Sequence, residues 1–174
     1  MVGNIELFPN IHLDVNQLIE QVDGSVVGSV FGTLKDIWEY VFIGIHYSSE
    51  EKKLKYENNL KLLSSQIHSN FEGIDPQNLQ DPKVSIVGPA LEASKYYISE
   101  PELRSMFANL ISAAADSSLN GKVRASFTEI VKQLEPIDAK VLEYLYQERE
   151  TPTVEYRNSN KDSGSFNIVL TNVF

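Results

Sequence analysis

The sequence of 174 residues predicts a mainly α-helical fold, in which long antiparallel helices form the body and a small β-hairpin follows at the C-terminus. The first observation behind this prediction is that apolar residues recur three and four positions apart through several long segments, as in amphipathic helices. The second is a change of pattern near the end of the chain. There, segments 153–157 and 165–174 are typical of strands, and the turn-rich segment 158–164 separates them.

The N-terminal quarter contains the most distinctive helix. Residues 1–12 predict an irregular or extended lead with a turn at Pro9-Asn10, and residues 13–22 predict a short helix. Residues 25–47 then predict a long helix whose apolar residues gather on one face. Its other side begins with glycines four residues apart. Each interior glycine costs about 1 kcal/mol relative to alanine, so this helix needs tertiary support.

The middle of the chain predicts two further helices joined by a linker. Ser49 is a suitable N-cap for a helix that starts with Glu50-Glu51, because carboxylates favour the positive end of the helix dipole. One apolar stripe then runs along this helix: Tyr56, Leu60, Leu63, Ile67 and Phe71. Residues 72–83 predict a linker. Gly88-Pro89 predicts either the start of the next helix or a kink within it.

Two later helices are predicted to open with capping boxes, in which a serine caps the helix and a glutamate three residues later bonds back to the serine amide. The first box is Ser99 with Glu102, and the second is Ser126 with Glu129. Asn120-Gly121 predicts the turn between these two helices.

The last predicted helix begins at Pro136, because proline suits the first helical position. Its expected inner face is Ile137, Val141, Leu142 and Leu145.

These elements divide the chain into three segments. Residues 1–83 are an N-terminal helical region with the glycine-bearing helix, residues 84–149 are a compact helical region, and residues 150–174 are the hairpin. Two short helices followed by a hairpin have the outline of a winged helix, which would be incomplete here. Acids outnumber bases in the two short helices, so we favour a structural or protein-binding unit over a DNA reader.

Composition excludes several classes of protein. Without cysteine, the chain has no disulfide framework, no Cys-ligated zinc and no thiol nucleophile. A formal net charge of −9, concentrated in the first quarter of the chain, disfavours nucleic acid and anionic lipid as partners. No signal peptide and no apolar stretch of about 18 residues is visible. We therefore expect a cytoplasmic protein, with membrane association as a second option.

The sequence shows no catalytic, cofactor-binding or metal-binding constellation. The 3 histidines, His12, His46 and His68, lack the paired spacing of metal ligands. Segment 24–32 is rich in glycine but has neither the lysine nor the preceding strand of a phosphate-binding loop. We therefore favour a protein that is not an enzyme and holds no cofactor, and a hydrolase with an unrecognised site is the less favoured option.

The glycine-bearing helix is the candidate interaction surface. Gly24, Gly28 and Gly32 recur every four residues, a pattern that lets two helix backbones approach closely. Close packing within one domain is the simpler explanation, and self-association or contact with a membrane are the alternatives. The candidate surface comprises these glycines together with Trp38 and Phe42.

The segment from residue 74 to residue 145 carries a more specific resemblance. Its marks include Ile74-Asp75-Pro76, Val87-Gly88-Pro89-Ala90-Leu91-Glu92-Ala93, Glu100-Pro101-Glu102-Leu103-Arg104, Met106-Phe107-Ala108-Asn109-Leu110 and Pro136-Ile137-Asp138-Ala139-Lys140. In these motifs the chain resembles the bacterial Abi-alpha family, named for abortive infection and otherwise a domain of unknown function. The glycine-bearing helix is similar to the N-terminal region of that family. One departure is Arg124-Ala125-Ser126-Phe127, where members tend to have His-Pro-Ser-Phe.

The resemblance implies a role in phage defence, in which an infected cell stops growing or dies. It supplies no catalytic residues. We therefore expect a non-enzymatic defence protein that acts through contacts with a protein partner, a second copy or a membrane. The alternative is a regulatory or adaptor module that binds protein or nucleic acid through its winged-helix-like end.

Overall fold

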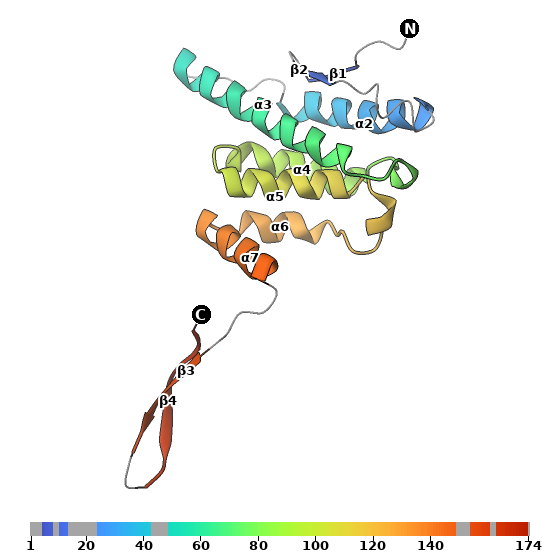
Figure 1. Cartoon of the computed structure of the whole chain (residues 1–174). Helices are drawn as coiled ribbons and strands as arrows, with labels where there is room; N and C mark the ends of the chain where they lie inside the picture. The colour runs from blue at the N-terminus through green and yellow to red at the C-terminus, as the bar shows by residue number, and fades with distance from the viewer. Residues whose placement is uncertain are drawn as a thin grey trace. The chain divides into compact units, whose positions relative to one another are not determined.

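The computed structural model describes most of the chain (Figure 1). The described residues are 5–8, 11–13, 24–42, 49–148, 154–160 and 163–173. They belong to two compact units, which we call the helical unit (Met1–Pro136) and the terminal unit (Ile137–Phe174). The predicted turn at Pro9-Asn10 and nearly all of the predicted helix 13–22 lie outside the described residues.

The described part of the helical unit consists mainly of α-helices, as the sequence predicts. They are α2 (Gly24–Phe42), α3 (Glu50–Glu72), α4 (Val84–Tyr97), α5 (Pro101–Ala113) and α6 (Ser126–Lys132). Short 3₁₀ turns connect α3 to α4 and α5 to α6, and these are η1 (Pro76–Asn78) and η2 (Ser117–Leu119). Gly121 follows η2 with a φ of 83°, which confirms the turn predicted there.

The N-terminal lead forms a small antiparallel hairpin of β1 (Ile5–Phe8) and β2 (Ile11–Leu13). The prediction of an extended lead is therefore confirmed. The predicted helix was expected to begin at Leu13, and this is wrong. Leu13 instead completes the ladder opposite Ile5, where an extended backbone pairs with its neighbour.

Helix α3 begins and ends as its sequence predicts. The side-chain oxygen of Ser49 accepts a hydrogen bond from the amide of Lys52 at 3.3 Å. The predicted apolar stripe is confirmed in its C-terminal part, where one face of the helix buries Leu63, Ile67 and Phe71. At the end of the helix, the amide of Gly73 donates to the carbonyl of Asn70 at 3.2 Å.

The core of the helical unit lies between α3, α4 and α5, with α2 along one edge. The largest fully buried side chains are Phe71, Phe107, Leu63, Leu91, Leu103, Ile111, Val30 and Val87. Removing this apolar surface from water is the main stabilising term for the unit. Helices α3 and α5 run in the same direction, because Gln66 contacts Arg104 and Asn70 contacts Asn109, so the contacts advance along both helices together.

Both predicted capping boxes are wrong. Helix α5 begins at Pro101 with Glu100 at its N-cap, so Ser99 lies one residue too early to cap it. The fixed φ of proline at the first helical position accounts for this start. Helix α6 begins at Ser126, because the amide of Phe127 already donates to the Arg124 carbonyl at 3.0 Å. The serine is therefore inside the first turn instead of capping it.

Gly88-Pro89 does not start a helix, because α4 begins four residues earlier at Val84. Pro89 lies inside the helix, where its ring removes one backbone hydrogen bond. Burial of Ile86, Val87, Ala90 and Leu91 on either side of it offsets that loss.

The terminal unit contains most of α7 (Pro136–Glu148) and a second hairpin, β3 (Val154–Ser159) with β4 (Phe166–Val173). Pro136 is the first residue of α7, and the hairpin is antiparallel, so both predictions are confirmed. The register shifts twice along the ladder, between Val154 and Tyr156 and between Tyr156 and Arg157. The resemblance to a winged helix is not confirmed.

The predicted inner face of α7 is wrong for two of its residues. Ile137 is 64% exposed and Leu142 is 46% exposed, while Ala139 is buried. An apolar stripe marks a face that can pack, but packing also requires a neighbouring element.

Candidate interaction surfaces

Helix α2 contains the residues that the sequence singles out as an interaction surface. Its described buried side chains are Val30, Leu34, Trp38 and Val41. Trp38 is only 4% exposed, and its ring lies 4.4 Å from the ring of Phe42, centroid to centroid. Trp38 therefore lies on the core side of α2, and Phe42 is half-buried beside it.

The glycine side of α2 points in another direction. At about 100° per residue, Gly32 lies about 120° around the helix from Trp38. A Cβ added at Gly32 would meet no described atom within 4 Å, so the space at this position is open among the described residues. Gly24 and Gly28 are helical, but their surroundings lie outside the described side chains. The structure therefore separates Gly32 from Trp38, and a contact role for the glycines stays a prediction.

A second feature is a groove of about 390 Å³ where α3, α5 and η2 meet. Its apolar walls come from Ile74, Ala113 and Leu119. Its polar lining residues are Ser69, Asn70, Asn109, Ser112 and Asp116. The sequence named Ile74 and Asn109 only within motifs of the family resemblance and did not predict the groove, because its residues come from segments about 40 positions apart.

An amide pair and a carboxylate stand at this groove. The side-chain nitrogen of Asn70 donates to the side-chain oxygen of Asn109 at 2.8 Å, which joins α3 to α5. One carboxylate oxygen of Asp116 accepts from the amide of Ser118 at 2.8 Å and so caps η2. Ser112 is buried, and its hydroxyl donates to the Ala108 carbonyl at 2.9 Å. The groove thus offers oxygen acceptors, and its lining contains no lysine, arginine or histidine among the residues that the structure describes.

A buried arginine, Arg104, lies on α5 five residues before Asn109. The guanidinium of Arg104 donates to the Ile98 carbonyl at 2.9 Å and to the Gln66 side chain at 3.2 Å. Burial lowers the pKa of Arg104, but a guanidinium stays protonated at any physiological pH. The positive charge of Arg104 lies at the C-terminal end of α4, where it interacts favourably with the negative end of the helix dipole. We therefore interpret Arg104 as a structural residue.

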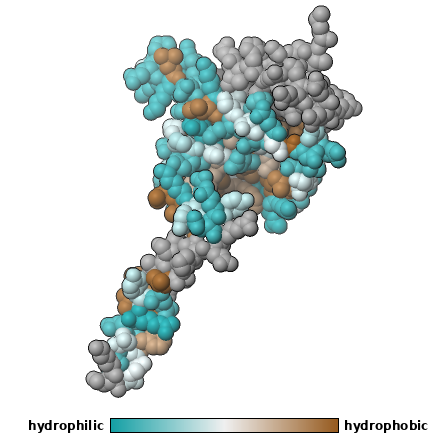
Figure 2. All heavy atoms as spheres, in the orientation of Figure 1, coloured by the Kyte–Doolittle hydropathy of each residue, from teal (hydrophilic) through white to brown (hydrophobic). Residues whose placement is uncertain are grey.

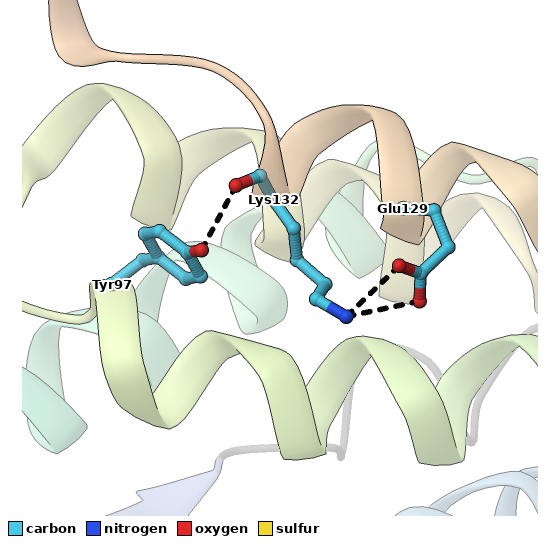
Figure 3. A network of polar contacts seen from close by, with 3 residues as sticks. All are labelled: Tyr97, Glu129 and Lys132. Atoms are coloured by element: carbon cyan, nitrogen blue, oxygen red, sulfur yellow. Dashed lines mark hydrogen bonds and ion pairs between the residues drawn. The ribbon is translucent and has the colours of Figure 1, made fainter.

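The last residue of α4, Tyr97, makes a polar contact with the last residue of α6, Lys132 (Figure 3). The hydroxyl of Tyr97 donates to the backbone carbonyl of Lys132 at 2.9 Å, and the Lys132 ammonium bonds both oxygens of Glu129 at 2.9 and 3.1 Å. The hydrogen bonds to Glu129 hold the pKa of Lys132 above its ordinary value of 10.5. Lys132 and Glu129 are three residues apart on α6, and both side chains are substantially exposed, as in an ordinary ion pair on a helix surface.

The hairpin of the terminal unit exposes its apolar side chains (Figure 2). Cross-strand partners Tyr156 and Leu170 are 58% and 56% exposed. Ile168 and Val169 are 53% and 61% exposed on the same strand. A two-stranded hairpin is marginal alone in water, and its outer edges present unpaired backbone groups. This hairpin therefore has both apolar surface and backbone capacity for contact.

The described residues contain no group of three or more His, Cys, Asp and Glu side chains that could hold a metal ion. His68 lies 3.4 Å from the carboxylate of Glu72, one turn further along α3, which is a common surface pairing. Within the same described ranges, no helix combines the length and the apolar character needed to cross a membrane.

Comparison with known proteins adds one finding. A family model described as abortive infection alpha matches residues 55–174. The match begins within α3 and includes the groove, α7 and the terminal hairpin. The chain matches no curated protein and no solved structure.

Proposed function

This chain belongs to the abortive infection alpha family, and from that premise we propose that it takes part in phage defence by contacting a protein, either a partner or a second copy. The family supplies the biological process. The exposed apolar hairpin of the terminal unit is the observation that supports contact as the mode of action.

The exposure of the hairpin favours contact for a physical reason. Large apolar side chains that stay in water forgo the stabilisation that burial would give, about 25 cal/mol for each Å² of apolar surface. Val154, Tyr156, Phe166 and Leu170 are each about half exposed. A partner that covers them gains this energy, and aromatic anchors such as Tyr156 often dominate protein interfaces.

A protein partner fits the charge of the chain better than nucleic acid or anionic lipid does. The net charge is −9, and in the terminal unit acids outnumber bases. Nucleic acid and anionic membranes attract proteins through clustered lysine and arginine. Peripheral contact with a membrane would then depend on apolar residues alone.

Phage challenge of bacteria with and without the chain tests the proposed process. In abortive infection an infected cell stops growing or dies, so the culture should survive when few cells are infected and should collapse when nearly all are infected. Phage yield per infected cell should fall in both cases. Equal phage yield with and without the chain, at matched expression and across several phages, would contradict the proposal.

A further inference from the structure

The groove between α3, α5 and η2 differs from its surroundings in its electrostatics. Helices α3 and α5 run in the same direction, and both end here, at Glu72 and Ala113. The C-terminus of a helix carries about half a negative charge. The carboxylate of Asp116 adds a full negative charge at the same place, and none of the described residues that line the groove is basic.

Hydrogen-bond acceptors also remain available in the groove. The amide nitrogen of Asn70 is used by Asn109, which leaves the Asn70 side-chain oxygen with no partner among the described residues. One oxygen of Asp116 takes the amide of Ser118, and the other has no hydrogen-bond donor in the described part of the chain. A ligand that fills the groove should therefore donate hydrogen bonds and carry positive charge.

From this arrangement we propose that the groove binds an arginine side chain of a protein partner. A guanidinium is planar and weakly hydrated and donates in several directions, so it can reach the Asp116 carboxylate and the Asn70 oxygen together. Its aliphatic stem can lie along Ile74, Ala113 and Leu119, which form the apolar part of the lining. The net charge of −9 also favours the approach of a basic segment.

A metal ion is a poorer fit than a guanidinium. Divalent cations prefer several carboxylate or carbonyl oxygens around one point. Among the described residues, Asp116 is the one carboxylate that lines the groove, and no cluster of three or more acidic or histidine ligands includes it. The identification of the ligand as part of a protein rests on the proposed function, whereas its positive charge rests on the groove.

Titration of the labelled full chain with two short capped peptides, followed by NMR, tests the proposal. One peptide is Ala-Arg-Ala, and the other carries citrulline, a neutral arginine analogue of nearly the same shape. The arginine peptide should give saturable shifts at the amides of Gly73 and Ala113 and at the side-chain amides of Asn70 and Asn109. The citrulline peptide should give none, and salt should weaken the binding of the arginine peptide.

A matched pair of variants separates the groove from general attraction to an acidic chain. Asp116→Asn removes the charge but keeps an oxygen that can cap η2. Asp75→Asn makes the same change at η1, where Asp75 accepts from the Gln77 amide at 2.9 Å but does not line the groove. Asp116→Asn should weaken binding of the arginine peptide about tenfold, as the loss of a charge-assisted hydrogen bond does. Asp75→Asn should leave it unchanged.

Three results would overturn the proposal: no saturable shifts with the arginine peptide, equal weakening by both variants, or displacement of the peptide by Mg²⁺ at a lower concentration than that of the peptide. Phage protection is a separate readout. If Asp116→Asn loses peptide binding and still protects fully, the proposal that the groove holds an arginine of a partner is overturned as well, while defence stands. If the parent chain binds the peptide and never protects, the proposed function fails, while the groove stands as a binding site.

Discussion

The helical unit and the terminal unit use their apolar residues in opposite ways. In the helical unit, Phe71 and Phe107 are at most 1% exposed. In the terminal unit, Tyr156 and Leu170 are both more than half exposed, and Ala139 is the one buried residue among the residues described there. The difference indicates that the first unit has a core of its own, while the second leaves apolar surface exposed, as the proposed contact requires.

The largest expected effect is in the core of the helical unit. Phe107→Ala should destabilise the chain by about 3–5 kcal/mol, because it removes a fully buried ring and leaves a cavity. The same kind of truncation in the hairpin, Leu170→Ala, should cost less than about 1.5 kcal/mol, because the side chain already lies mostly in water. Urea unfolding of both variants measures this, and similar losses would contradict the division between the units.

Arg104 gives the next largest effect. Arg104→Met should cost about 2 kcal/mol, because the Ile98 carbonyl and the Gln66 side chain lose their donor in a buried place. Arg124→Met also removes one positive charge, but at an exposed position, so it should lower the free energy of unfolding by less than about 0.5 kcal/mol. If both variants unfold at the same urea concentration, Arg104 is not the structural residue described above.

A substitution at Gly32 should raise the stability of the helical unit, whereas the two substitutions above lower it. Gly32→Ala should stabilise the helical unit by up to about 1 kcal/mol, because a helix interior favours alanine and the position has room for a Cβ. If the glycine side of α2 contacts a second copy, Gly32→Leu should also lower self-association in sedimentation experiments. A Leu variant that assembles as the parent does would remove the glycine side from the candidate interaction surface.

The smallest expected effect on stability comes from removing the ion pair between Lys132 and Glu129. The folded-state pKa of Lys132 is raised above 10.5, so the folded chain holds this proton more tightly than the unfolded chain does. The stabilisation is complete below about pH 10.5 and is lost as the pH rises through the higher folded-state pKa. The difference in Tm between the parent and Lys132→Gln should therefore stay constant below about pH 10.5 and close as the pH rises above it. The control is Lys122→Gln, at an exposed lysine without an ion pair among the described residues, and its difference in Tm should not change with pH.

The sequence predicted which segments are helical more accurately than it predicted the residue at which each helix begins. The stripe of α3 from Leu63 to Phe71 was clear because three apolar residues repeat on one face with polar residues opposite. The capping boxes failed because a serine followed by a glutamate fits two neighbouring starts, and hydrogen bonds such as that of Phe127 to Arg124 decide between them.

The candidate sites were harder to predict than the fold. Trp38 was grouped with the glycines because they share one helix, but a helix has several faces, and burial placed Trp38 toward the core. The groove could not be found from the sequence, because it exists only where Asn70 meets Asn109 and where two helix ends come together. Which distant segments meet is decided by tertiary packing, and the local pattern of a single sequence does not show it.

Phage protection by a hairpin variant tests the central claim most directly. Tyr156→Thr with Leu170→Thr removes one exposed apolar cross-strand pair but keeps residues that favour strands. The control, Asn158→Thr with Asn167→Thr, changes a polar cross-strand pair two residues further along β3. At equal levels of folded protein, the first variant should lose most of its protection and the control should keep it. Full protection by the Tyr156 and Leu170 variant would contradict a defence role that depends on contact through the hairpin.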